Sequence, residues 1–404
     1  MPTIPLKPFW STNDNGATAR LFAGDVRAVA SRLPEGFVQS IVTSPPYWGI
    51  RDYHGVDRSL ELGQEDTPEE FVARLVEVFR LLSRVLRRNG TLWLNLGDCY
   101  GPKRKCRRSG LLGVPWMVAR ALQDDGWILR QDIIWWKPDP MPSPVFNPCR
   151  NAHEYVFLFS QSKDWYYDAD AIREEGTRSL ESNEAAFRDV RESATELERG
   201  EVAGAGVLTN GRVFGAETKV EPYATGTRNK PSVWKIAKEG YAGKHFATFP
   251  RKLVEPCVLA GTSAHGECAE CGSPYRRVVD KLAITRDRPN DYVKRTGESE
   301  AGRAEGNSCP NSVAGVEVIT KGWEKTCGCI CERVRPQVVL DPFAGSGTAL
   351  AVALDLGRFG VGIDLSEEYL RNSAIPRIEG LCLGRPAMAG LVGKRREAVS
   401  LGIG

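Results

Sequence analysis

Two short segments hold residues that could carry out chemistry on a flat, electron-rich group. The first is Thr43-Ser-Pro-Pro-Tyr-Trp48. Ser44 and the backbone carbonyl of Pro45 can accept hydrogen bonds from both hydrogens of an amino group on an aromatic ring, which would localise its lone pair. Pro45 and Pro46 fix φ and make the turn rigid, and Tyr47 offers a ring face for stacking. These residues suit attack by an exocyclic amine on a group that is already activated.

The second segment is Asp341-Pro-Phe-Ala-Gly-Ser-Gly-Thr348, which lies between a buried strand and an Ala/Leu-rich helix. Gly345 and Gly347 let the backbone approach a ligand closely, because no Cβ intervenes. The next strand ends in Asp364, nineteen residues after Gly345, where a carboxylate can reach a ribose hydroxyl. Leu350 stands where a dinucleotide fingerprint needs a third glycine, which disfavours NAD and FAD. The pattern predicts a nucleoside-containing cofactor, and the alternative is a structural loop.

The second segment resembles the S-adenosylmethionine motif of DNA amino-methyltransferases. The resemblance implies that Gly345 and Gly347 line the methionine part of the cofactor and that Phe343 flanks it. Asp364 would hold the ribose. Asp25 would contact the adenine edge, although capping of the helix that follows it is an equal alternative. The other residues expected at the cofactor are Thr43, Asp341, Pro342, Ser346, Thr348 and Phe249.

The first segment resembles the catalytic motif of cytosine-N4 and adenine-N6 methyltransferases. That resemblance assigns the catalytic role to Ser44, Pro45, Pro46 and Tyr47. Serine at position 44 is typical of the cytosine-N4 branch, whereas adenine-N6 members mostly carry Asp or Asn there. The catalytic motif precedes the cofactor motif, as in the permuted β arrangement. We expect a site-specific enzyme that flips cytosine out of duplex DNA and methylates its N4 amino group by direct attack. Adenine-N6 methylation and a catalytically inactive DNA-binding scaffold are the alternatives.

A basic run and one aromatic residue are candidates for contacting DNA. The run lies in a loop that follows a predicted strand end, on the same rim as Tyr47, where phosphates would bind. A solvated basic loop is the alternative. Trp48 is the aromatic candidate, and the basic candidates are Lys103, Arg104, Lys105, Arg107 and Arg108. Double-stranded DNA is the expected partner, and a cognate restriction endonuclease is a second one to test.

Six of the eleven cysteines lie in the segment from Cys268 to Cys331. Cys268 and Cys271 have the spacing of a strong half-site for a tetrahedral metal ion. We favour Cys327 and Cys329 as the second pair, with Cys331 as the alternate. A structural zinc ion would stabilise this polar segment, and reduced free thiols are the alternative.

Two Pro-Cys pairs also require an interpretation, because carbon-5 cytosine methyltransferases attack the ring with such a thiolate. Cys149 and Cys257 both precede the glycine-rich segment, whereas that family places its cysteine after it. We interpret both as core or surface thiols.

The elements that must position these segments follow an alternation of apolar strands and helical patterns. Thr67 is the predicted N-cap of a helix in which Pro68 takes the first position and Glu70 completes a capping box, and the helix should stop at Asn89. Strands are expected at 19–23, 38–43, 91–96, 130–136, 154–159, 338–341 and 359–364. The pattern predicts an α/β fold with a doubly wound, mostly parallel, seven-stranded Rossmann-like sheet and two inserted satellite elements.

The predicted core is interrupted twice. Its catalytic half is expected at 18–170, and its cofactor half at 232–261 and 336–380. Residues 171–231, acidic at first and then glycine-rich, stand where a target-recognition insertion is expected. Residues 262–335 are predicted to form a cysteine-rich, zinc-ribbon-like insertion.

The composition excludes several classes of protein. The chain has 404 residues, of which 42% are apolar, so it can bury a core and is not a disordered chain. Its net charge of +3 is small, so a polyanion must be met by a local basic patch. Neither a long apolar run nor a signal-peptide pattern is present, and we expect no membrane association. The expected location is the cytoplasm, at the nucleoid of a prokaryote or of a phage-infected cell.

Overall fold

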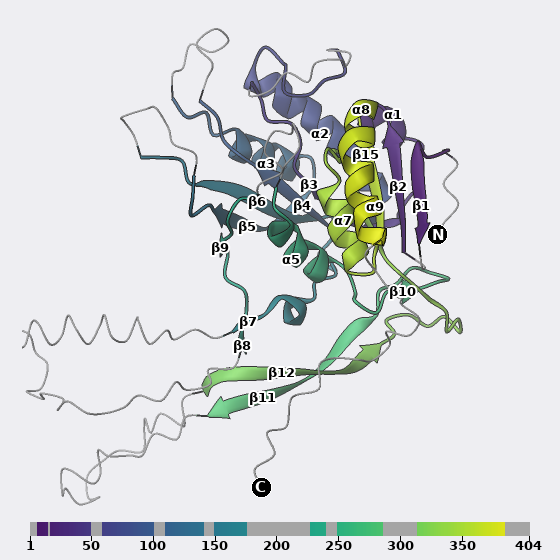
Figure 1. Ribbon diagram of the computed structural model, residues 1–404. Helices are drawn as coiled ribbons and strands as arrows, with labels where there is room; N and C mark the ends of the chain where they lie inside the picture. Colours follow the sequence, from purple (N-terminus) through teal and green to yellow (C-terminus); the bar gives the residue numbers. More distant parts are fainter. Residues whose placement is uncertain are drawn as a thin grey trace, which may run out of the picture. The chain divides into compact units, whose positions relative to one another are not determined.

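The structure is a computed structural model that describes residues 6–14, 17–49, 59–100, 110–140, 149–175, 227–239, 249–285 and 313–383 (Figure 1). The chain divides into two compact units. The first comprises Met1–Ile172, Pro231–Arg277 and Gly322–Gly404, and the second comprises Arg173–Lys230 and Val278–Lys321. All candidate catalytic, cofactor and cysteine residues belong to the first unit.

A nine-stranded sheet forms the centre of the first unit (Figure 1). Neighbouring strands are parallel at β2–β15, β15–β14, β14–β3, β3–β4 and β5–β9, and antiparallel elsewhere. In spatial order the strands are β1 (Trp10–Asp14), β2 (Ala17–Ala23), β15 (Phe359–Asp364), β14 (Val338–Asp341), β3 (Val38–Thr43), β4 (Leu86–Leu96), β6 (His153–Ser160), β5 (Ile128–Trp136) and β9 (Val233–Lys235).

This arrangement confirms the predicted mostly parallel Rossmann-like α/β fold. The seven central strands are the seven that the sequence predicts. The predicted count is nevertheless too low, because β1 and β9 extend the sheet at its two edges. Both edge strands are short, and each pairs with one neighbour only, so their apolar patterns are weak.

Helices cover both faces of the sheet, as its nearly continuous apolar strands require. Ile41 and Leu340 belong to the apolar cluster shared with α1, α2 and α3, whereas the adjacent Val42 and Val339 belong to the cluster shared with α5 and α7. The helices are α1 (Val26–Ala30), α2 (Pro68–Val85), α3 (Val114–Asp124), α5 (Arg251–Gly261), α7 (Thr348–Asp355), α8 (Glu367–Tyr369) and α9 (Ile375–Leu383). The described residues also include two single turns, the 3-10 helix η1 (Ala169–Ile172) and the π-helix η2 (Leu370–Ala374).

The long amphipathic helix α2 begins as predicted and ends earlier than predicted. Thr67 Oγ1 accepts a hydrogen bond from Glu70 N at 3.2 Å, which caps the helix. The backbone becomes extended at Leu86, and β4 starts there rather than at Thr91. A Cβ at Gly90 would lie 2.8 Å from Gln39 O, so this part of β4 lies tightly against β3. Among the described helices, none is both long and apolar enough to cross a bilayer.

The second unit contains a four-stranded sheet of β11 (Arg276–Thr285), β12 (Val313–Glu324), β8 (Thr227–Arg228) and β7 (Glu174–Glu175), with the first residues of β11 and the last of β12 assigned to the first unit. Its members therefore come from both predicted insertions. The cysteine-bearing ends of the second insertion, including the short pair β10 (Glu267–Cys268) and β13 (Val334–Arg335), belong to the first unit. Most of the predicted recognition insertion lies outside the described residues.

Candidate active site

A cleft of about 280 Å3 opens at the carboxyl edge of the sheet, where β2, β3, β14 and β15 end. The neighbouring strands β3 and β14 are parallel, so the turns that follow them leave the sheet side by side. Thr43 Oγ1 donates a hydrogen bond to Asp341 Oδ1 at 2.7 Å and joins the two strand ends. Residues 44–47 from one turn and 342–346 from the other line the same cleft. The topology therefore brings together two segments that are far apart in the sequence.

The glycine turn after β14 presents its backbone to the cleft. Gly345 has φ 48° and Gly347 has φ 72°, both in the left-handed region that favours glycine. Asp364, at the end of β15, accepts hydrogen bonds from Gly345 N at 2.7 Å and from Ser366 N at 2.9 Å. Burial raises the pKa of Asp364. This carboxylate lines the cleft and also fixes the turn beside it.

Asp341 lies behind the glycine turn rather than in the cleft. Its side chain is fully buried, and Oδ1 accepts hydrogen bonds from Thr43 Oγ1 and from Phe343 N at 3.1 Å. Its Oδ2 has no hydrogen-bond partner among the described residues. Burial raises the pKa of Asp341 to about 7. Asp341 therefore shapes the turn, together with Thr43, instead of facing the cleft.

Asp25 caps α1, as one of its two predicted roles requires. Its Oδ1 accepts hydrogen bonds from Arg27 N at 2.9 Å and Ala28 N at 3.4 Å, and the Arg27 guanidinium binds both carboxylate oxygens. Burial acts to raise the pKa of Asp25, but the hydrogen bonds and charge of Arg27 outweigh burial and lower it. Asp25 also lines the cleft, so capping does not remove it from the site.

Tyr47 is held by a polar network at the opposite side of the cleft. Its hydroxyl donates to Glu154 Oε2 at 2.9 Å and accepts from Asn95 Nδ2 at 2.9 Å. Ser44 Oγ lies 3.3 Å from the same hydroxyl. Burial, assisted by the charge of Glu154, raises the pKa of Tyr47 well above its usual value of 10. Tyr47 is therefore a neutral phenol with a fixed ring.

Three residues of this network were not predicted as site residues. Asn95 comes from β4, Lys137 follows β5, and Glu154 comes from β6. Lys137 Nζ donates to Glu154 Oε1, and it lies 4.4 Å from the centroid of the Trp135 ring. Each oxygen of Glu154 thus has a partner. In the sequence, these three residues are marked as polar residues at the ends of apolar strands.

Gly97 makes room for this arrangement. A Cβ at Gly97 would lie 2.8 Å from Tyr47 Cε2 and 3.2 Å from the Glu154 side chain. Both distances are shorter than ordinary van der Waals contact. The position of the Tyr47 ring therefore depends on the absence of a side chain at Gly97.

Comparison with known proteins agrees with this geometry. Residues 38–267 and 334–375 match the family model of N6 and N4 enzymes described as DNA methylase. The chain belongs to this family. The Type II methyltransferase M.Cfr9I of Citrobacter freundii is 32% identical, over 91% of this chain and 89% of its own length. The Type II methyltransferase M.XycI of Xanthomonas campestris pv. cyanopsidis is 31% identical, over 89% of this chain and 87% of its own length.

A solved structure has a similar fold. The PvuII DNA methyltransferase (cytosine-N4-specific) matches with a TM-score of 0.50 at 15% identity, covering 94% of this chain and 95% of that chain. The predicted resemblance to DNA amino-methyltransferases is thus confirmed. DNA is the substrate of this methylase family, and S-adenosylmethionine is the cofactor that the sequence predicts.

The described residues of this DNA methylase fit that cofactor. The Gly345 turn leaves open space beside its backbone, because a Cβ there would find no heavy atom closer than 3.9 Å. The carboxylates of Asp25 and Asp364 both line the cleft and can accept hydrogen bonds from hydroxyl or amino groups. Phe343 and Phe249 add apolar lining. The cleft thus combines a flat apolar lining with acceptors at two strand ends.

The remaining predicted cofactor residues have different positions. Pro342 lines the cleft directly. Ser346 and Thr348 reach its lining but are nearly buried, and Arg377 Nη1 donates to their hydroxyls at 3.1 and 2.7 Å. Gly347 and Thr43 are not among the lining residues. Their contribution is to the shape of the two turns.

The prediction that Trp48 contacts DNA is wrong for this structure. Its side chain is 1% exposed, and its Nε1 donates a hydrogen bond to Glu65 O at 3.0 Å. Trp48 packs in the apolar core with α2, so it supports the turn from behind. The basic candidates Lys103, Arg104, Lys105, Arg107 and Arg108 lie outside the described residues.

The two Pro-Cys cysteines are away from the cleft lining. Cys257 is 2% exposed in α5, and Cys149 is exposed. Neither lines the cleft. Their interpretation as core and surface thiols agrees with these positions.

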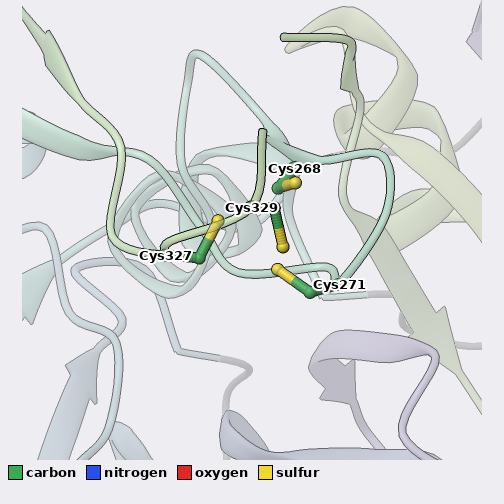
Figure 2. Close-up of side chains that lie close together, drawn as sticks. All are labelled: Cys268, Cys271, Cys327 and Cys329. Carbon is green, nitrogen blue, oxygen red and sulfur yellow. The ribbon is translucent and has the colours of Figure 1, made fainter. Parts of the chain in front are cut away.

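The four favoured metal-ligand cysteines lie together (Figure 2). One sulfur atom from each of Cys268, Cys271, Cys327 and Cys329 lies within 4.8 Å of the other three. Cys331, the predicted alternate, is not in this group. All four thiols are free of disulfide bonds.

Proposed function

We propose that this DNA methylase transfers the methyl group of S-adenosylmethionine to the exocyclic N4 amino group of cytosine in a specific duplex sequence. The observation that carries the proposal is the single cleft lined by the Ser44–Tyr47 turn and by the glycine turn of Gly345. A methyl donor held by the second turn and an amine held by the first would face each other across it.

The cofactor side of the site would be formed by the ends of β2, β14 and β15. Asp364 would accept hydrogen bonds from the ribose hydroxyls, and Asp25 from the adenine amino group. The backbone of Gly345 would lie against the methionine part, because no Cβ intervenes. S-adenosylmethionine supplies a methyl group already activated by its sulfonium charge, so no protein nucleophile is required.

The acceptor side would be formed by the rigid turn after β3. The Pro45 carbonyl and Ser44 Oγ would each accept one hydrogen of the cytosine amino group. Its lone pair would then point towards the methyl group, forming the N–C bond as the S–C bond breaks. The excess proton on nitrogen would leave along one of these two hydrogen bonds and pass to bulk water. The pKa of Tyr47 is raised well above its usual value of 10, so its phenol keeps its proton at neutral pH. Tyr47 therefore cannot act as the base.

Tyr47 would bind the flipped base by stacking. Base–aromatic stacking contributes about 1–3 kcal/mol per base. Asn95 and Glu154 hold the hydroxyl of Tyr47, and Lys137 neutralises the charge of Glu154. The ring is therefore ordered before the base arrives, which reduces the entropy cost of binding.

Cytosine is proposed as the target because serine occupies position 44, as in the cytosine-N4 branch that the motif resembles. A type II system with a cognate restriction endonuclease is proposed because both relatives above are named Type II methyltransferases. Such an enzyme would act on chromosomal DNA in the cytoplasm.

The test is to identify the methylated nucleoside. The full chain is incubated with genomic DNA and methyl-labelled cofactor, and the DNA is digested to nucleosides for mass spectrometry. We expect labelled N4-methylcytosine. Labelled N6-methyladenine would contradict the cytosine assignment but keep amino methylation. No labelled nucleoside from any DNA, with cofactor binding intact, would favour an inactive scaffold.

A further inference from the structure

The four-cysteine cluster in the first unit is a second site, separate from the methylation cleft. From the geometry we infer that Cys268, Cys271, Cys327 and Cys329 bind one structural zinc ion. In a tetrahedral zinc–thiolate centre the Zn–S distance is about 2.3 Å, which places the sulfurs roughly 3.8 Å apart. The sulfurs here lie within 4.8 Å of one another, so small side-chain adjustments complete the tetrahedron.

The first cysteine pair lies on a turn that is fixed to the core sheet. Cys268 N donates to Ser273 O, and Gly272 N donates to Cys268 O, both at 2.9 Å. The next residue towards the N-terminus, Glu267, is 1% exposed and accepts two hydrogen bonds from Arg87, at the start of β4. Arg87 also donates to Gly272 O. One guanidinium therefore anchors both ends of this turn.

The second cysteine pair lies on a loop that is folded around a lysine. Lys325 Nζ donates to the backbone carbonyls of Cys329 and, at 2.7 Å, Cys331. Thr326 Oγ1 donates to Pro274 O at 2.6 Å and joins this loop to the first turn. Four thiolates and one Zn²⁺ carry a net charge of −2, which the Lys325 ammonium partly offsets.

This second loop has almost no apolar packing of its own. None of residues 325–333 is buried, and Ile330, between two cysteines, is 94% exposed. Hydrophobic burial therefore cannot explain why the loop holds a defined shape with two sulfurs turned towards another pair. A metal ion supplies that stability directly, since its binding free energy becomes folding free energy.

The zinc ion would close a long loop of the chain. The two cysteine pairs are separated in sequence by the strands β11 and β12, with Cys271 shortly before β11 and Cys327 shortly after β12. Cross-linking both ends lowers the entropy of the unfolded chain, and the effect grows with loop length. The ion would thus fix the base of the β11–β12 pair to the core.

The test is the metal content of the full chain, which does not depend on methyl transfer. Protein purified from cells grown with added zinc and iron is analysed by inductively coupled plasma mass spectrometry. We expect about one zinc and no iron per chain. In C271S and C329S the zinc content should fall at least about ten-fold. C331S and C149S are the matched controls and should keep their zinc.

A second measurement covers variants that fail to fold. Titration of the wild-type protein with an organomercurial should release one zinc ion as the four thiols of the cluster react. Wild-type protein without zinc under these conditions, or with iron in its place, would overturn the inference. A loss of zinc in C331S equal to that in C329S would overturn the ligand set.

Discussion

The methylation cleft and the cysteine cluster lie in one folding unit but are built in different ways. The cleft is lined by turns whose ends are fixed by fully buried strands, such as β3 and β14. The cluster is lined by two loops, and none of residues 325–333 of the second is buried. A rigid sheet positions the first site, whereas polar contacts and, as we infer, a metal ion position the second.

This difference indicates how each site should respond to change. Substitutions in the cleft should alter the rate of methyl transfer with little effect on folding, because the sheet holds the strand ends. Removal of metal from the cluster should lower stability with little effect on cofactor binding. The four predictions below test this separation, beginning with the largest expected effect.

Replacing Ser44 with alanine should give the largest effect. We expect the rate of methyl transfer to fall roughly 100-fold or more, since one acceptor aligned with the amino group is lost in the transition state. Cofactor affinity and unfolding midpoint should stay close to wild type. Initial rates with labelled cofactor measure the effect. S83A, which removes an intrahelical hydroxyl contact in α2, is the control and should keep full activity. Equal rates in S44A and wild type would remove Ser44 from catalysis.

Removal of metal from the wild-type protein should lower the unfolding midpoint by roughly 5 °C, because the loop closed by the cysteine pairs gains freedom in the unfolded chain. Differential scanning calorimetry before and after chelation measures the shift, and adding zinc should reverse it. Affinity for S-adenosylhomocysteine, measured by calorimetric titration, should change less than about two-fold. Joint loss of stability and of cofactor binding would show that the two sites are not independent.

Gly97→Ala should disturb the cleft from behind. The added Cβ would collide with the Tyr47 ring and with Glu154, so the ring must shift. We expect kcat to fall about ten-fold, the equivalent of about 1.4 kcal/mol, with zinc content unchanged. Gly380→Ala, where a Cβ meets nothing within 4 Å, is the matched control. Wild-type kcat in the Gly97 variant would show that the exact place of Tyr47 is not important.

Asp341→Asn should change how stability depends on pH. Burial raises the pKa of Asp341 to about 7, so between pH 4 and 7 the folded protein keeps a proton that the unfolded chain releases. Wild-type stability from this group is present at low pH and falls, by at most about 1.4 kcal/mol per pH unit, as pH rises to 7. The asparagine variant lacks this loss, so its stability relative to wild type should rise over that range. Urea unfolding at several pH values measures the difference, and a constant or falling difference would contradict the raised pKa.

The sequence predicts the central strands of the sheet, because each is a short run of apolar residues. The seven central strands are apolar almost throughout, because both sheet faces are covered, and this makes them visible without a structure. The edge strands β1 and β9 lack that double burial, and no comparable pattern marks them. The early end of α2 is also hidden, since Leu86 continues its apolar spacing although the backbone is already extended there.

The candidate site is predicted less completely, for a related reason. Ser44 and Gly345 lie in continuous motifs, and both line the cleft. Asn95 and Glu154 reach Tyr47 only because β4 and β6 pair in one antiparallel register, which the sequence does not state. Trp48 follows Tyr47 directly but turns into the core, so adjacency in the motif is no guide to side-chain direction.

The central claim is that one cleft holds both the methyl donor and the target amine. The most direct test is a structure of the full chain with S-adenosylhomocysteine and duplex DNA that contains the methylated site. We predict a flipped cytosine stacked on Tyr47, its amino group bonded to Ser44 Oγ and Pro45 O, and its nitrogen facing the cofactor sulfur beside Gly345. A cofactor or a base bound outside this cleft, or an amino group turned away from the sulfur, would contradict the account.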